Sequence, residues 1–213
     1  MRQIEITSDL VAQVRDIAHE AGVAILHVYA EMRSRDAGVA GVLVAHKVDD
    51  SPLTRADLVA HTLIGQRLAV LTPDIQVVSE EEEQSLKHRR PLGDFWLVDP
   101  LDGTKEFLAQ NGEFTVNIAL VRDGEAVLGV VVAPALGQTY WGAKGLGAFR
   151  ETEGRIEPIR VAEPPPANRP VRVLASKSHM NACTTEFIRQ LGAHEVVQAG
   201  SSLGILIPPS VVL

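Results

Sequence analysis

The stretch Phe95-Trp96-Leu97-Val98-Asp99-Pro100-Leu101-Asp102-Gly103-Thr104 joins an apolar run to a short acidic segment. The first four residues are typical of a buried strand, and the next six are expected to form a short loop that brings two carboxylates, a glycine and a hydroxyl together. Mg²⁺ takes oxygen ligands, and a protein usually offers it one or two carboxylates while water and substrate phosphate supply the rest. The stretch therefore predicts a site for a divalent cation and a phosphate group after a strand.

A second acidic segment, Ser79-Glu80-Glu81-Glu82-Glu83, follows another strand-like run at residues 75–78. Taken singly, each segment has a simpler explanation, because Asp-Gly is common in turns and a run of glutamates is usually a solvated surface. The combination of two acidic strand ends favours one shared metal centre.

The six residues from Asp99 to Thr104 match the Asp-Pro-Ile/Leu-Asp-Gly-Thr signature of the lithium-sensitive, magnesium-dependent phosphatases related to inositol monophosphatase. Residues 47–57, 79–81 and 176–179 resemble further segments of that family. Within the family, residues 105–107 and 111–120 are most similar to the 3′(2′),5′-bisphosphate nucleotidases of the CysQ type. The resemblance extends from the N-terminus to about Leu203.

The residue pattern along the chain predicts mixed helices and strands. Thr7-Ser8-Asp9 precedes an apolar stripe of helical spacing, and Thr54 opens a second helix that Thr72-Pro73 ends. Residues 42–48 are strand-like, and Arg122-Asp123-Gly124-Glu125 predicts a hairpin between strands at 114–121 and 126–132. Beyond the proline-rich residues 163–167, the pattern alternates as strand, helix and strand.

The resemblance implies an α/β fold, a layered α-β-α-β sandwich of the inositol monophosphatase or sugar phosphatase type. Its first part is expected to be α+β. We expect an N-terminal metal-binding domain at residues 1–162 and an incomplete C-terminal α/β domain at residues 163–213.

The family match also implies a metal site with two or three Mg²⁺ ions, Mn²⁺ being an alternative because both accept carboxylate oxygen. Glu80, Asp99 and the main-chain carbonyl of Leu101 would hold the first ion, and Asp99 would bridge to a second ion held by Asp102. Asp57, Thr104 and Glu80 form the expected catalytic set, in which Asp57 and Thr104 activate a water. Asp57 is equally well explained as an acid at a helix N-terminus.

The substrate implied by the resemblance is adenosine 3′,5′-bisphosphate or its sulfated form, which would place the protein in sulfur metabolism. The expected contacts are Leu101, Asp102, Gly103, Thr104, Ser176, His179, Gly200 and Ser201. His179 is at least equally well explained as a structural or capping residue. Inositol 1-monophosphatase activity and a non-catalytic metal- or nucleotide-binding remnant are the alternatives.

Composition excludes some classes of protein and agrees with a soluble enzyme, for which the cytoplasm is the default location, whereas the small-molecule substrate is what the resemblance implies. The 213 residues are 46% hydrophobic and carry a net charge of −7, which argues against a nucleic-acid-binding protein. The single cysteine, Cys183, excludes an internal disulfide. No apolar run reaches the roughly eighteen residues of a membrane span.

The resemblance stops near the end of the chain. Gly204 stands where the family has a lysine, and residues 205–213 lack the Trp-Asp pair whose Asp completes the second metal site. These features predict a chain truncated or frame-shifted after about Leu203, the alternative being a genuine short variant that obtains its missing groups elsewhere. We expect weakened second-metal binding and little turnover. An exposed sheet edge and apolar surface would then favour a homodimer or aggregation.

Overall fold

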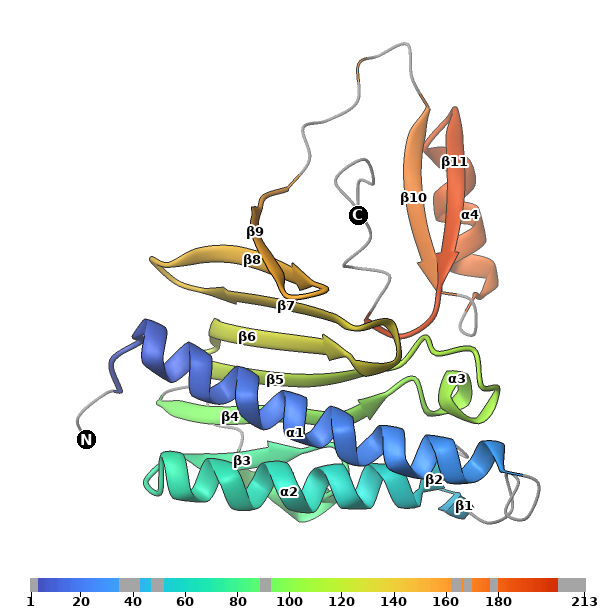
Figure 1. The fold of residues 1–213 in the computed structure, drawn as a ribbon. Helices are drawn as coiled ribbons and strands as arrows, with labels where there is room; N and C mark the ends of the chain where they lie inside the picture. The colour runs from blue at the N-terminus through green and yellow to red at the C-terminus, as the bar shows by residue number, and fades with distance from the viewer. Residues whose placement is uncertain are drawn as a thin grey trace.

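The computed structural model describes residues 4–34, 43–46, 52–88, 93–161, 166, 170–176 and 180–202. Within these residues, the main element is a seven-stranded sheet of order β3-β4-β5-β6-β7-β8-β9 (Figure 1). Its strands are β3 (Gln76–Ser79), β4 (Asp94–Asp102), β5 (Thr115–Arg122), β6 (Glu125–Ala133), β7 (Gln138–Ala143), β8 (Gly147–Thr152) and β9 (Arg155–Ile159). Strands β3 and β4 are parallel, and every later neighbouring pair is antiparallel.

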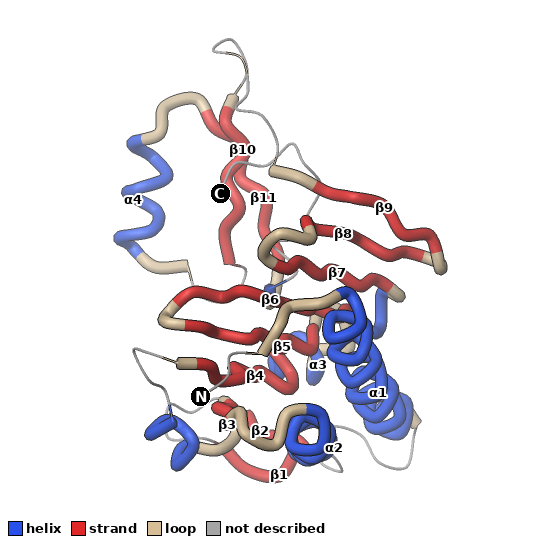
Figure 2. The backbone as a smooth tube through the Cα atoms, turned by 90° about the vertical axis from the view of Figure 1, so that its left-hand side faces the viewer, coloured by secondary structure: helices blue, strands red, loops and turns tan. Residues whose placement is uncertain are grey.

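Two long helices, α1 (Ser8–Arg33) and α2 (Arg55–Leu71), lie side by side over one face of this sheet (Figures 1 and 2). The predicted caps are confirmed, because the hydroxyls of Thr7 and Thr54 accept hydrogen bonds from the first turns of α1 and α2. The apolar stripe of α1 is buried and packs with α2 and strands β4–β6 in one core. Thr72 ends α2, as predicted.

The hairpin between β5 and β6 is also confirmed. Asp123 and Gly124 have φ values of 51° and 83°, the left-handed conformation that a two-residue turn of this kind requires. Two shorter strands, β1 (Leu43–His46) and β2 (Pro52–Thr54), form a separate antiparallel pair. The predicted strand at residues 42–48 is therefore observed at Leu43–His46, and its ends lie outside the described residues.

Strand β4 is longer than the sequence indicates. The acidic segment was expected to form a loop after Val98, but β4 continues to Asp102, and its pairing with β5 is interrupted between Asp99 and Asp102. The strand continues because β5 extends past the end of β3 and still offers backbone partners. A short helix, α3 (Thr104–Leu108), begins after Gly103.

No strand was predicted for the residues of β7, β8 and β9. β7 and β8 are half-buried and the edge strand β9 is mostly exposed, so their apolar and polar residues alternate weakly. Trp141 of β7 stacks on Phe149 of β8 with ring centroids 5.6 Å apart, and the guanidinium of Arg15 lies 3.7 Å above the Trp141 ring. Contacts of this kind, and not an alternating pattern of apolar residues, stabilise these strands. Two 3-10 segments, η2 (Glu83–His88) and η3 (Pro134–Leu136), complete this part of the chain.

The C-terminal unit consists of β10 (Val171–Ser176), α4 (Ala182–Gln190) and β11 (His194–Ala199). Its two strands are parallel, and the unit stands apart from the main sheet (Figures 1 and 2). The predicted order of strand, helix and strand is confirmed. The division at residue 162 remains a prediction, since residues 162–165 and 167–169 lie outside the described part.

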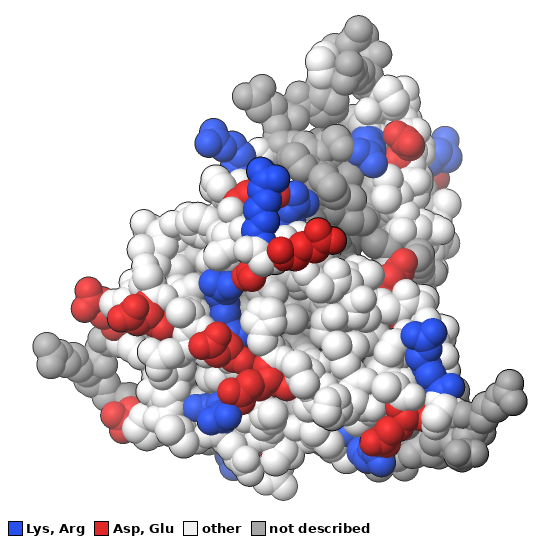
Figure 3. All heavy atoms as spheres, viewed as in Figure 1, with Lys and Arg blue, Asp and Glu red and all other residues white. Residues whose placement is uncertain are grey.

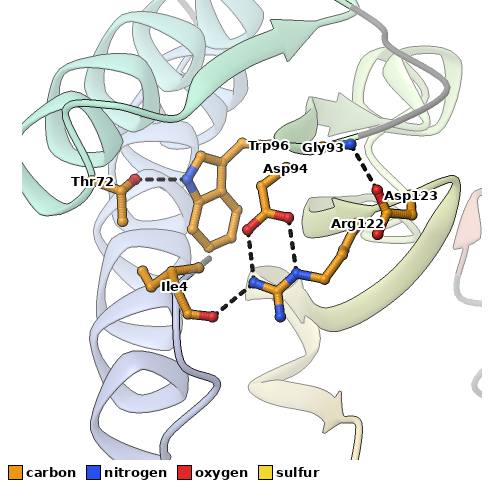
Figure 4. A network of polar contacts seen from close by, with 7 residues as sticks. All are labelled: Ile4, Thr72, Gly93, Asp94, Trp96, Arg122 and Asp123. Carbon is orange, nitrogen blue, oxygen red and sulfur yellow. Dashed lines mark hydrogen bonds and ion pairs between the residues drawn. The ribbon is translucent and has the colours of Figure 1, made fainter. Parts of the chain in front are cut away.

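A polar network far from the acidic segment ties the N-terminus to the sheet (Figure 4). Arg122 donates to both carboxylate oxygens of Asp94, at 2.8 and 2.7 Å, and to the carbonyl of Ile4 at 2.7 Å. The indole N–H of Trp96 donates to the Thr72 hydroxyl at 2.8 Å. These bonds satisfy polar groups next to the core and so stabilise the fold.

The surface view in Figure 3 shows acidic and basic side chains interspersed on the face that carries α1 and α2. None of the helices in the described ranges combines the length and the apolar character needed to cross a membrane.

Candidate active site

The parallel pairing of β3 and β4 brings the two acidic strand ends together. Ser79 lies opposite Val98 in the register, and the Glu80 N–H donates to the Val98 carbonyl at 3.0 Å. Glu80 and Asp99 each follow directly after these paired positions. The carboxyl ends of parallel strands lie at the same end of the sheet. The two carboxylates therefore become neighbours although they are far apart in sequence.

The pKa of the Asp99 carboxyl is strongly raised. Burial, followed by the charges of Glu80 and Asp102, a hydrogen bond with Glu80 and the charge of Glu81, raises the pKa of Asp99 to about 9. Its Oδ1 atom is buried and has no hydrogen-bond partner among the described residues. A cation would satisfy this oxygen and offset the repulsion between the carboxylates, so the donor set fits Mg²⁺.

Asp102 faces a different set of partners. Its Oδ2 atom accepts hydrogen bonds from Ser202 N at 2.5 Å, from Asn117 Nδ2 at 3.3 Å and from Thr115 Oγ1 at 3.5 Å. In the part of the chain that is described, no three His, Cys, Asp or Glu side chains converge as a complete metal site. The carboxylates are close enough to shift the pKa of Asp99 without meeting at one point, so the predicted ligand roles remain predictions.

Asp57 and Thr104, the predicted pair, are in contact. Asp57 is fully buried, and its Oδ1 atom accepts a hydrogen bond from the Thr104 hydroxyl at 3.2 Å. Its Oδ2 atom accepts from the Thr54 N–H at 2.7 Å and from the Thr54 hydroxyl, which closes a capping box at the start of α2. The Leu101 carbonyl, the predicted main-chain ligand, lies 3.3 Å from the Thr104 hydroxyl.

The end of β11 reaches the acidic segment. Gly103 has a φ of +94°, and a Cβ at this position would lie 2.8 Å from the Cβ of Ser201. Gly200 is buried against Glu106 of α3. The predicted contacts Leu101 to Thr104 and Gly200 to Ser201 are therefore close together. Ser176 is the last residue of β10, with no described side chain, and His179 lies outside the described residues.

The comparisons with known proteins agree with this arrangement. Residues 8–205 match the model of the inositol monophosphatase family. The chain belongs to the inositol monophosphatase family.

Relatives of this family member include proteins named 3′(2′),5′-bisphosphate nucleotidase CysQ. The protein from Salmonella typhimurium is 46% identical over 194 residues, covering 91% of this chain and 74% of the relative. The protein from Escherichia coli K12 is 44% identical over 191 residues, covering 90% and 73%. The crystal structure of CysQ from Bacteroides thetaiotaomicron has a TM-score of 0.73 and 33% identity, covering 95% of this chain and 76% of that chain. An inositol monophosphatase from Thermotoga maritima has a TM-score of 0.72 and 25% identity, covering 93% and 71%.

Several polar residues near the acidic segment of this inositol monophosphatase family member were not predicted as site residues. Thr115 and Asn117 both contact Asp102. They are two residues apart in β5 and so lie on the same face of the strand, a spacing that is visible in the sequence. His61 of α2 lies 2.8 Å from the Ser79 hydroxyl, next to Glu80. Glu80, Asp99 and Asn117 also line a largely apolar cavity of about 400 Å³ across β3–β6.

Proposed function

We propose that this chain is a magnesium-dependent phosphomonoesterase that removes the 3′-phosphate of adenosine 3′,5′-bisphosphate or of its sulfated form. The relatives named CysQ support this substrate class over inositol phosphate. The observation that carries the proposal is the buried Asp99 carboxylate, with one unpartnered oxygen, beside Glu80 and Asp102. The inositol monophosphatase family is generally dependent on Mg²⁺, and two or three ions, or Mn²⁺ in their place, are proposed here.

The side chains of Glu80, Asp99 and Asp102, with the Leu101 carbonyl, are the groups that would hold Mg²⁺. When bound, the ion supplies positive charge to the phosphoryl oxygens and lowers the pKa of a water. Substrate phosphate would complete the coordination, as it does where a protein offers only a few carboxylates.

Asp57 and Thr104 would move the proton of the attacking water. The Thr104 hydroxyl donates to Asp57 Oδ1, which leaves the lone pairs of Thr104 Oγ1 able to accept a proton from water while its own proton passes to the carboxylate. The two hydrogen bonds from Thr54 fix the Asp57 carboxylate in this orientation. The structural role of Asp57 as a helix cap and its proposed role in the reaction use different oxygen atoms.

Residues 101–104 would face the phosphate, and Gly200 and Ser201 would contact the nucleotide. Gly103 suits close approach because it has no side chain and holds a left-handed conformation. Ser176 and His179 complete the proposed set of nucleotide contacts.

The test is phosphate release from adenosine 3′,5′-bisphosphate at saturating Mg²⁺, compared between the wild type and Asp99→Asn. We expect the substitution to lower the rate at least about 100-fold, because the group that holds the cation is lost. An unchanged rate would contradict the proposed site. Inositol 1-phosphate, assayed in parallel, should be the poorer substrate. Binding of Mg²⁺ without release from either substrate would favour the non-catalytic alternative.

We also propose that the protein works in the cytoplasm as a homodimer. Apolar side chains of the C-terminal unit are exposed, with Phe187 at 64%, Val196 at 42% and Leu191 at 40%. Exposed apolar surface of this kind favours association. Light scattering should give the mass of a dimer, and Phe187→Glu should shift it toward the monomer. A monodisperse wild-type monomer would contradict the proposal.

A further inference from the structure

The short turn formed by residues 200–202, called here the 200–202 turn, connects the C-terminal unit to the acidic segment and β5. Four hydrogen bonds join the two sides. They are Gly200 N to Glu113 Oε2 at 3.2 Å, Thr115 Oγ1 with Ser201 Oγ at 3.4 Å, Asn117 Nδ2 to Ser202 Oγ at 3.0 Å, and Ser202 N to Asp102 Oδ2 at 2.5 Å.

The fit of this turn is also steric. A Cβ on Gly200 would lie 2.7 Å from Cγ and 2.9 Å from Oε1 of Glu106, which is itself buried. A Cβ on Gly103 would lie 2.8 Å from Cβ of Ser201 and 3.0 Å from the Glu113 carbonyl. Contacts this short leave no room for a methyl group on either side of the interface. The position of the turn relative to the acidic segment is therefore tightly defined.

The hydrogen bond from Ser202 links this turn to the chemistry of the site. A backbone N–H that donates to a carboxylate is a strong, charge-assisted interaction, and it fixes the direction in which that carboxylate points. Asp102 is a candidate ligand of Mg²⁺, and outer partners that orient a ligating group commonly change metal affinity by 10- to 100-fold. Movement of the 200–202 turn would thus alter the metal site without touching the metal.

We propose that Glu113 is a positioning residue for Mg²⁺ binding. Its carboxylate accepts the Gly200 N–H, this contact seats the 200–202 turn, and the seated turn aims Asp102 through the Ser202 N–H. Glu113 stands at the end of this chain of contacts and acts only through them. The proposal rests on the proposed function, because it assigns Asp102 to the metal site.

The first test measures Mg²⁺ affinity by calorimetry for the wild type, Glu113→Ala, Glu113→Gln and the control Glu5→Ala, which removes an exposed glutamate. We expect about tenfold weaker binding for Glu113→Ala. Gln keeps an oxygen acceptor and should remain within about twofold of the wild type, as should the control. In the phosphate-release assay, Glu113→Ala should raise the Mg²⁺ concentration needed for half-maximal rate and leave the rate at saturating Mg²⁺ within about twofold. Wild-type affinity in Glu113→Ala would overturn the proposal.

A second pair of variants tests the turn without changing Glu113. Gly200→Ala should also weaken Mg²⁺ binding, because the new methyl group would push the turn away from Glu106. Gly200→Ala combined with Glu106→Ala removes the atoms that the methyl group would meet and should restore most of the affinity. Wild-type affinity in Gly200→Ala, or no recovery in the double variant, would overturn the proposal.

Amide hydrogen exchange separates this proposal from the proposed function. Glu113→Ala should accelerate exchange of the Gly200 and Ser202 amides about tenfold, since both hydrogen bonds weaken together. If the wild type neither binds Mg²⁺ nor releases phosphate, the proposed function fails, and the exchange measurement still tests the seating of the turn. Unchanged exchange in Glu113→Ala would overturn the positioning role even in an active enzyme.

Discussion

At the scale of single residues, Asp57 illustrates how one carboxylate serves the fold and the site. A helix N-terminus favours an acid, and this explanation alone accounts for the contacts with Thr54. The hydrogen bond from Thr104 lies on the other oxygen, where the capping box leaves a position for it. Both sequence interpretations of Asp57 therefore describe real contacts, and only the second has a proposed chemical role.

Asp99→Asn should stabilise the metal-free protein and remove its response to Mg²⁺. Burial raises the pKa of Asp99 to about 9 in the folded state. Between about pH 4 and pH 9 the carboxyl therefore ionises in the unfolded state but stays protonated in the folded state, so a rise in pH disfavours the folded state. The stability associated with the protonated carboxyl is present at acid pH and is lost as the pH rises toward 9. The neutral amide avoids this loss, and in EDTA the variant should gain on the wild type from pH 5 to pH 9 by at least about 1.4 kcal/mol. Thermal unfolding checks this, and equal pH profiles would contradict it.

Thr104→Ala should lower kcat by about 100-fold or more, because the hydroxyl that would relay the proton is removed. Thr104→Ser keeps the hydroxyl and should stay within about tenfold of the wild type. Mg²⁺ affinity should change little in either variant, since the side chain is not a proposed ligand. Steady-state kinetics at saturating Mg²⁺ make the comparison, and similar kcat values for Ala and Ser would contradict the role.

At the scale of elements, the register of β3 and β4 decides where the acidic groups meet. Ser79 and Val98 are paired in parallel, so Glu80, which directly follows β3, becomes a neighbour of Asp99, which still lies within β4. The start of α2 then brings Asp57 to Thr104, which opens α3. The site is therefore assembled from the ends of four elements, each of which would be unremarkable alone.

Thr54→Ala should lower the free energy of unfolding by about 1 kcal/mol and also reduce kcat, because it opens the capping box and releases Asp57. Thr7 caps α1 in a similar way without contacting the site, so Thr7→Ala is the matched control. It should lose similar stability and retain its kcat. Urea unfolding measures the loss of stability, and phosphate release measures kcat. Equal kcat in the two variants would contradict a link between the Thr54 cap and the proposed catalytic pair.

At the scale of the whole molecule, the network around Arg122 and the 200–202 turn hold different parts together. Arg122 joins Ile4, which precedes α1, to Asp94 at the start of β4. The turn instead joins the C-terminal unit to the end of β4 at Asp102. Stability and metal binding are therefore expected to respond to different substitutions.

Arg122→Leu should lower the free energy of unfolding by about 1 to 3 kcal/mol, because Asp94 and the Ile4 carbonyl lose their charged donor. Mg²⁺ affinity should remain that of the wild type. Arg160 is exposed, and Arg160→Leu should change stability by no more than about 0.5 kcal/mol. Chemical denaturation with a parallel calorimetric titration checks both, and a loss of affinity in Arg122→Leu would contradict the separation.

Much of the fold could be predicted from local patterns. The caps at Thr7 and Thr54 and the turn at Asp123-Gly124 depend on neighbouring residues, so their physics is contained in short stretches of sequence. Strands β7–β9 could not be predicted in this way, because their side chains are half-buried or exposed and contacts with remote residues, such as Arg15 with Trp141, stabilise them. The predicted length of β4 was also wrong, because pairing with the remote strand β5 extends β4 to Asp102.

The family, the acidic segment at Asp99 to Thr104 and the kind of chemistry that two carboxylates and a hydroxyl support could all be predicted from the residues and motifs of the chain. Strand pairing and packing were needed to show that Asp102 faces Ser202, that Asp57 has an oxygen directed to Thr104, and that Gly200 lies against Glu106 and Glu113. The physical reason is distance along the chain. Residue types and short spacings are local properties, whereas the direction of a carboxylate depends on donors that strand pairing and packing bring from remote segments.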